Sequence, residues 1–164
     1  AIPAFIDYIR KSKASEVHEN LDKCYKGIID YYEKPRGTET GETVSSTMPA
    51  DQVWVCPTTA ADCTALGGES SYIDAAAYAV GGAADTFKAI KFIMTEATYG
   101  CYQYTSTTPG ASPAAATDQF RCEACTDIDD DDALCLWAKV GTYRVPTATF
   151  SGGHVWHDDA TDDW

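Results

Sequence analysis

The opening segment, residues 1 to 34, constrains the fold most, because it predicts one long amphipathic helix. Apolar side chains recur at intervals of three and four residues, as on one face of a helix, at Phe5, Ile9, Val17, Leu21, Cys24, Tyr25, Ile28 and Tyr32. Such a helix would be roughly 50 Å long, which exceeds the width of a domain of this size. We therefore expect part of it to protrude or to pack on another molecule.

The first turns of this helix carry apolar side chains around most of their circumference rather than along one stripe. The residues that crowd this end are Ala1, Ile2, Ala4, Phe5, Ile6 and Ile9. A helix that is apolar on every side is normally buried, so we expect this end to lie against other protein. Pro3 suits a first helical turn, and it would kink a helix that continued upstream. The chain therefore looks truncated at its start.

The run AIPAFIDYIRKSKASE resembles the end of the N-terminal segment of type IV pilins and type II secretion pseudopilins. The residues that match the family's A-I-P-x-[FY] motif and the basic stretch after it are Ala1, Ile2, Pro3, Phe5, Tyr8, Arg10, Lys11, Ser12 and Lys13. In that family a leader peptide and an apolar helical segment precede the motif. The resemblance implies a pilin fold and a subunit interface at Ala1, Ile2, Pro3, Phe5, Ile6 and Ile9.

Composition indicates one acidic domain. The chain has 164 residues, and its hydrophobic content of 45% is enough for a core. The formal net charge is -13, and residues 37 to 164 hold five Lys and Arg against nineteen Asp and Glu. Because proteins bind nucleic acid through clustered Lys and Arg, we expect no nucleic-acid partner.

Seven cysteines predict disulfides formed in an oxidising compartment. Hairpins centred near residue 111 or 112 and near residue 130 predict two bridges, and close spacing predicts a third. The expected pairs are Cys101–Cys122, Cys125–Cys135 and Cys56–Cys63. Cys24 would then be unpaired, although a bridge from Cys24 to the sheet is an alternative. A zinc site at the Cys122-x-x-Cys125 pair is the less favoured interpretation.

The rest of the chain predicts an irregular region followed by a sheet. Irregular structure is expected over residues 37 to 90, with Asp85 as the N-cap of a short helical turn. Alternating patterns predict strands at 90–94, 99–106, 118–127 and 134–145. A tail with aromatic anchors would follow at 146–164. We therefore expect an α+β fold, in which the helix of residues 1–36 packs on an antiparallel sheet of three to four strands within 91–145, beside disulfide-pinned loops.

An alternating aspartate run lies between the last two predicted strands. Asp127, Asp129 and Asp131 offer the hard oxygen ligands that calcium prefers. An EF-hand is excluded, because its twelfth position falls on Ala138 and its sixth on Asp132. A calcium-stabilised hairpin turn and an exposed acidic turn both remain open. The Tyr-rich strand before this run and the A-x-x-D-[LI]-D-x-D pattern resemble the second half of pilin-like proteins, except that aspartates replace the usual glycines.

The sequence predicts no enzyme active site. It has three histidines and lacks a Gly-x-Ser-x-Gly motif, a phosphate loop and a dinucleotide fingerprint. We interpret the tail residues His154, His157, Asp158 and Asp159 as solvated rather than as metal ligands.

The family resemblance implies a structural subunit of an extracellular type IV pilus. Its partners would be copies of itself and the inner-membrane assembly machinery, with the subunit held in the inner membrane before assembly. One alternative is a type II secretion pseudopilin with a calcium-stabilised loop. The other is a minor pilin or adhesin, whose ligand would be held by residues 37–84 or by the tail.

Overall fold

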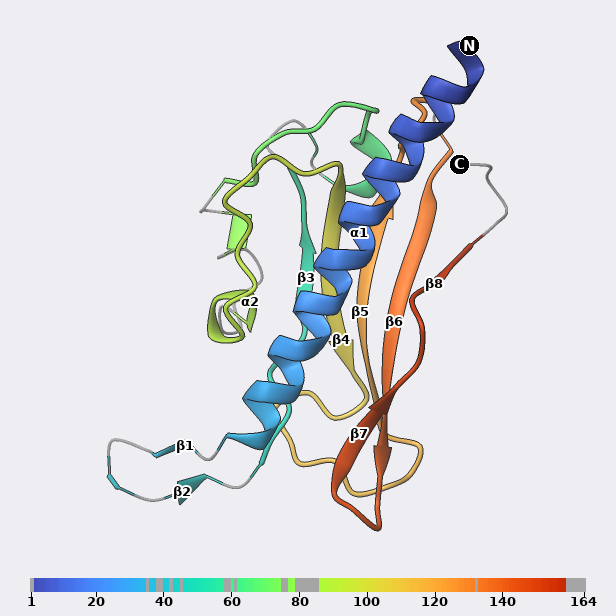
Figure 1. Cartoon of the computed structure of the whole chain (residues 1–164). Helices are drawn as coiled ribbons and strands as arrows, with labels where there is room; N and C mark the ends of the chain where they lie inside the picture. The colour runs from blue at the N-terminus through green and yellow to red at the C-terminus, as the bar shows by residue number, and fades with distance from the viewer. Residues whose placement is uncertain are drawn as a thin grey trace.

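A computed structural model describes residues 2–34, 36–37, 40–41, 43–44, 46–57, 60, 62–74, 77–78, 86–131 and 133–158. One long helix crosses one face of an antiparallel sheet, and its N-terminal turns extend beyond the ends of the strands (Figure 1). This arrangement confirms the predicted α+β class with a helix packed on a sheet.

The helix α1 runs from Ile2 to Glu33. Its last backbone hydrogen bond joins the Lys34 amide to the Asp30 carbonyl at 3.1 Å, and Pro35 follows in the sequence. A proline disfavours helical geometry in the residue before it, which explains why the helix ends here. Among the described residues, none of the helices combines the length and apolar character needed to span a bilayer.

The main sheet has six strands, more than the three to four predicted. They are β3 (Gln52–Val55), β4 (Gly100–Ser106), β5 (Gln119–Thr126), β6 (Cys135–Arg144), β7 (Thr149–Gly152) and β8 (Trp156–His157). The order is β3-β4-β5-β6-β7, and β8 also pairs with β6. The predictions for β4, β5 and β6 are confirmed. The extra strands come from the region expected to be irregular and from the tail, where segments of two to four residues show little periodicity.

Short elements complete the described part of the chain. They are β1 (Arg36–Gly37), β2 (Thr43–Val44), the 3-10 turn η1 (Cys63–Ala65) and the helix α2 (Thr86–Ala89). The strand predicted at 90–94 is absent, because the Phe92 amide hydrogen-bonds the Phe87 carbonyl at 2.7 Å and closes the helical turn. Lys91 adopts a positive φ of 59°, which is incompatible with an extended strand. Asp85, the predicted N-cap, lies outside the described residues.

The core lies between α1 and the sheet. The helix contributes a stripe of buried residues at Ala14, Val17, Leu21, Cys24, Ile28 and Tyr32. The sheet contributes aromatic and small side chains at Tyr102, Tyr104, Phe120, Cys122, Ala124 and Trp137. Full burial of one large apolar side chain stabilises a fold by about 1.5–3 kcal/mol, so this contact holds the helix in place.

Three disulfides cross-link the described residues. They join Cys24 to Cys122, Cys56 to Cys101, and Cys63 to Cys125. Cys135 is buried and lies outside these pairs. The predicted pairs Cys56–Cys63, Cys101–Cys122 and Cys125–Cys135 are therefore wrong, whereas the alternative of a bridge from Cys24 to the sheet is confirmed.

Strand register explains why the predicted pairs fail. Cys101 lies opposite Cys125, so the β4–β5 hairpin is centred later than residue 112. Cys135 lies opposite Thr126 rather than Cys125. A shift of one residue moves a side chain to the other face of a sheet. Cys122 consequently faces α1, while Cys101 and Cys125 face away from it.

The helix-to-sheet disulfide predicts a large stability effect. Replacing both Cys24 and Cys122 with alanine should lower the free energy of unfolding by about 2–5 kcal/mol, because the bridge closes a long loop in the unfolded chain. Denaturant unfolding measures this loss. Cys135→Ala is the matched control, and a loss as large for the control as for the double variant would contradict the assignment. Non-reducing peptide mapping should recover the three observed pairs.

Gly141 provides a second test of the packing. A Cβ at this position would overlap the ring of Phe120, which is fully buried against Tyr25 and Phe150. The buried ring would have to shift against these neighbours, so Gly141→Ala should cost about 1–3 kcal/mol of stability, as overpacked core substitutions do. Gly153→Ala is the control, because a Cβ there meets no heavy atom within 4 Å. Equal unfolding midpoints for the two variants would refute this packing.

Candidate functional site

The structure brings together the three aspartates that the sequence singled out. Asp127 directly follows β5, and Asp129 and Asp131 lie in the turn that leads to β6. One carboxylate oxygen from each residue lies within 4.8 Å of the other two. Asp127 is only 1% exposed, Asp129 is half-buried and Asp131 is exposed. The turn is therefore an inward-facing acidic cluster rather than a fully solvated one.

Two oxygens of this cluster are buried without a hydrogen-bond partner. Asp127 accepts a hydrogen bond from the Asp131 amide at 3.2 Å through Oδ1, but its Oδ2 has no partner. Asp129 places Oδ2 3.5 Å from the Arg10 guanidinium, and its Oδ1 has no partner. Buried polar atoms are nearly always satisfied by protein, water or an ion. These two oxygens therefore mark a place for a donor or a cation.

The electrostatic environment of Asp127 also favours a bound donor or cation. Burial raises the pKa of this carboxyl, and the negative charges of Asp130 and Asp131 add to the increase. Hydrogen bonds from the amides of Asp131 and Asp130 oppose it. A carboxyl whose pKa is raised by folding stabilises the fold while protonated, and that contribution is lost as the pH rises through the folded-state pKa. A bound cation would reverse this by favouring the charged form.

Hydrogen bonds connect the aspartate turn to α1 and to the loop that contains Gly68. Lys13 donates hydrogen bonds to the carbonyls of Gly68 at 2.8 Å and Ile128 at 3.2 Å. The Gly68 amide donates to Asp130 Oδ1 at 3.3 Å, and Asp130 has a positive φ of 61°. The sequence pattern gave no indication of these contacts. The turn geometry is therefore set by three segments that are distant in the sequence.

The cluster fits a hard divalent cation such as calcium. Asp127, Asp129 and Asp131 supply three carboxylates, and calcium prefers six to eight oxygen ligands, often completed by water. The buried, unsatisfied oxygens are the specific feature that a solvated acidic turn would lack. The ion would neutralise charge that the fold otherwise holds at a cost in free energy.

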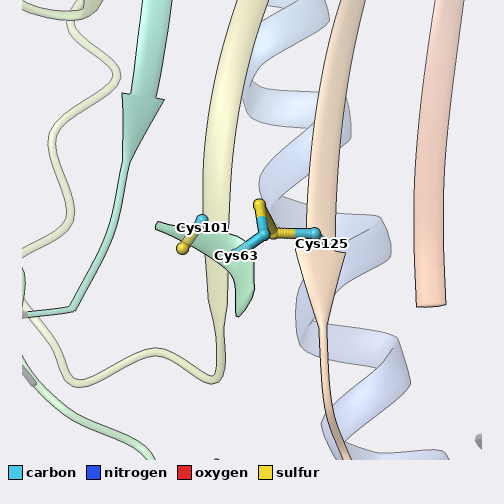
Figure 2. A group of neighbouring side chains, drawn as sticks. All are labelled: Cys63, Cys101 and Cys125. Carbon is cyan, nitrogen blue, oxygen red and sulfur yellow. A yellow bond between two sulfur atoms is a disulfide. The ribbon is translucent and has the colours of Figure 1, made fainter. Parts of the chain in front are cut away.

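The cysteines do not form a zinc site. Cys122 and Cys125 lie on opposite faces of the sheet and belong to different disulfides. The sulfur atoms of Cys63, Cys101 and Cys125 lie within 4.8 Å of one another (Figure 2). This cluster consists of two adjacent disulfides, because Cys101 is bonded to Cys56.

Of the tail histidines expected to be solvated, His154 is exposed, whereas His157 lies partly against an aromatic side chain. The rings of His18 and His157 lie 5.3 Å and 5.1 Å from that of Trp137, both edge to face. Burial lowers the pKa of His18, and the neighbouring His157 adds to the decrease. Within the described ranges, no histidine belongs to a cluster that could hold a metal ion.

The predicted subunit interface is an exposed apolar surface. Phe5 is 63% exposed, Tyr8 is 70% exposed, and Ile6 and Ile9 are also exposed. Pro3 is exposed as well. Ala1 and the side chain of Ile2 lie outside the described residues. The N-terminal turns of α1, which extend beyond the strands (Figure 1), therefore carry exposed large apolar side chains.

Calcium should stabilise the chain through the aspartate turn. At a free calcium concentration 100 times the dissociation constant, the free energy of unfolding should rise by about 2.7 kcal/mol. In EDTA at neutral pH, Asp127→Asn should melt at or above the wild-type midpoint, because it removes a buried charge. The same variant should lose the calcium response. Thermal melts in EDTA and in calcium measure both effects.

The variant Asp118→Asn serves as the control. Asp118 is an aspartate outside the cluster, and its carboxylate accepts hydrogen bonds from the amides of Ala114 and Ala115. Its replacement should lower stability equally with and without calcium. A wild-type midpoint that is unchanged by calcium would eliminate a metal role for this turn.

No protein-family model, curated protein or solved structure matches this chain. Its functional assignment therefore depends on two local features. One is the partly buried aspartate turn, and the other is the exposed apolar end of α1.

Proposed function

We propose that this chain is a structural subunit of an extracellular filament of the type IV pilus kind, assembled through its N-terminal helix. The observation that carries the proposal is the exposed apolar end of α1, at Phe5, Ile6, Tyr8 and Ile9. The resemblance of the run AIPAFIDYIRKSKASE, which contains these residues, to the pilin N-terminal segment also supports the proposal.

Copies of this helix would bury what one subunit leaves exposed. Each large apolar side chain that becomes fully buried contributes about 1.5–3 kcal/mol. A head-to-tail contact that does not close on itself generates a helical filament, in which every subunit makes the same contacts. The sheet side of the domain would then lie outside the bundle of helices.

The chemistry of the domain suits an extracellular filament. Three disulfides persist in an oxidising environment. Two of them, Cys56–Cys101 and Cys63–Cys125, hold the loop after β3 against the sheet. The net charge of -13 keeps exposed surfaces of neighbouring filaments apart. By the same family resemblance, the assembly partner is the pilus machinery of the inner membrane.

A type II secretion pseudopilin is the second candidate function. The observation that favours it is the pair of buried, unsatisfied oxygens on Asp127 and Asp129, which suit a calcium-stabilised loop. The two candidates differ in the filaments they form. Long filaments that persist in a chelator support a pilin, whereas short filaments that require calcium support a pseudopilin.

Removing the apolar end should abolish assembly without unfolding the domain. The double variant Phe5→Ala and Ile9→Ala, made in the full-length gene in its host cells, should produce no filaments, because both side chains are exposed in the single subunit. The thermal midpoint of the isolated domain should change little, since exposed substitutions cost within about 0.5 kcal/mol. Electron microscopy and melting curves measure the two effects.

Ile93→Ala is the matched control, because Ile93 is an exposed apolar residue at 47% exposure in the segment that follows α2. Its filaments should match those of the wild type. Normal filaments from the double variant, or none from the unmodified gene, would overturn the proposal.

A further inference from the structure

A groove crosses the face of the sheet that points away from α1. Strand register places four residues in one row across it, with Gln103 opposite Glu123, Glu123 opposite Ala138, and Ala138 opposite Trp156. Side chains alternate along each strand, so the neighbours of this row, such as Trp137, point into the helix-facing core. The row therefore forms the floor of a groove on the outer face.

Tryptophans from two different strands, β3 and β8, line this groove on the outer face. Trp54 comes from β3, and Trp156, which is 60% exposed, comes from β8. Leu136 and Val140 add apolar surface from β6, and Leu136 is 44% exposed. The small side chain of Ala138 keeps the floor low between them. Two indoles thus flank a shallow depression rather than filling a core.

The polar residues of the floor interact with one another. Gln103 donates a hydrogen bond from Nε2 to Glu123 Oε2 at 2.6 Å, and the Arg121 guanidinium lies 4.0 Å from Glu123 Oε1. All three line the groove and remain partly accessible. They carry amide, carboxylate and guanidinium groups, which offer both donors and acceptors. The charges of Arg121 and Glu123 cancel, so the floor is polar without a net charge.

Disulfides fix the groove in advance of any ligand. Trp54 packs against the cluster of Cys56, Cys101 and Cys125, which lies on the same face of the sheet. The bridge from Cys56 to Cys101 ties the end of β3 to β4. A site held in its binding geometry loses less conformational entropy when a ligand binds.

We propose that this groove binds a neutral carbohydrate chain. The apolar face of a pyranose ring stacks on an indole, and its hydroxyls both donate and accept hydrogen bonds, as the network of Gln103, Arg121 and Glu123 requires. The net charge of -13 disfavours polyanions such as nucleic acid and acidic glycans. An extended peptide would find no unpaired backbone groups on the floor, because β4, β5 and β6 are hydrogen-bonded on both sides.

Titration with defined oligosaccharides tests the proposal. Cellohexaose, chitohexaose and maltoheptaose at millimolar concentration should perturb tryptophan fluorescence, and at least one of them should bind saturably. Trp54→Ala and Trp156→Ala should each weaken that binding by about tenfold. Tyr72→Ala is the control, because Tyr72 is 65% exposed and lies outside the groove, and it should bind like the wild type.

Two further measurements keep the result independent of variant folding. Glu123→Gln keeps the shape of the side chain and should weaken binding severalfold without changing the melting temperature. Amide chemical shifts of the unmodified domain should change on sugar addition around Gln103, Glu123 and Ala138. Lack of binding by all three sugars, or binding that both tryptophan variants retain, would refute the proposal. Saturable binding of a proline-rich peptide or of heparin in place of these sugars would also refute it.

The result of the sugar-binding test does not depend on filament assembly. The groove lies on the sheet face opposite α1, whereas assembly depends on Phe5 and Ile9 at the exposed end of the helix. Loss of sugar binding with intact filaments would reject the groove alone. Sugar binding by a domain that forms no filaments would reject the filament proposal alone.

Discussion

The packing of α1 on one face of the sheet is the contact on which the rest of the structure depends. Its stripe from Ala14 to Tyr32 covers the aromatic side chains of β4, β5 and β6. The disulfide between Cys24 and Cys122 crosses this contact near its middle. The helix covers only one face of the sheet. The other face carries the disulfide-pinned loop and the groove beside it.

This one-sided packing also separates the chemistry of the molecule into three places. The N-terminal turns of α1 pass the sheet and keep their apolar side chains exposed. Further along the helix, Arg10 and Lys13 reach the aspartate turn, so the same element that would assemble a filament also positions the candidate cation site. The outer sheet face is independent of both. In the proposed filament, a subunit would therefore bury the first surface, order the second and expose the third.

The sequence supported the class of fold because the long elements have strong periodicity. A helix of 32 residues and strands of seven to ten residues carry enough repeats to identify their faces. Segments such as β7 and β8 do not, and they are strands because the long β6 offers both of them an edge to pair with. The strand expected at 90–94 does not form, because Phe87 and Phe92 pack on each other across a turn.

In the aspartate site, too, the sequence shows part of the arrangement and the tertiary structure supplies the rest. Its alternating carboxylates are visible in the sequence, but the burial of Asp127 and the contacts from Arg10, Lys13 and Gly68 come from segments far away along the chain. The outer groove left no sequence signal, because its row of residues comes from four strands and exists only in the register of the sheet.

The amino-acid sequence alone determined the long helix, the central strands, the acidic charge and the presence of disulfides, since each follows from local pattern or composition. Tertiary structure decided which cysteines pair, which aspartate oxygens are buried, and how the tryptophans of β3 and β8 flank one groove. The physical reason is that these properties depend on strand register and on contacts between distant segments. A register change of one residue reverses every side chain of a strand, while it leaves the local sequence pattern unchanged.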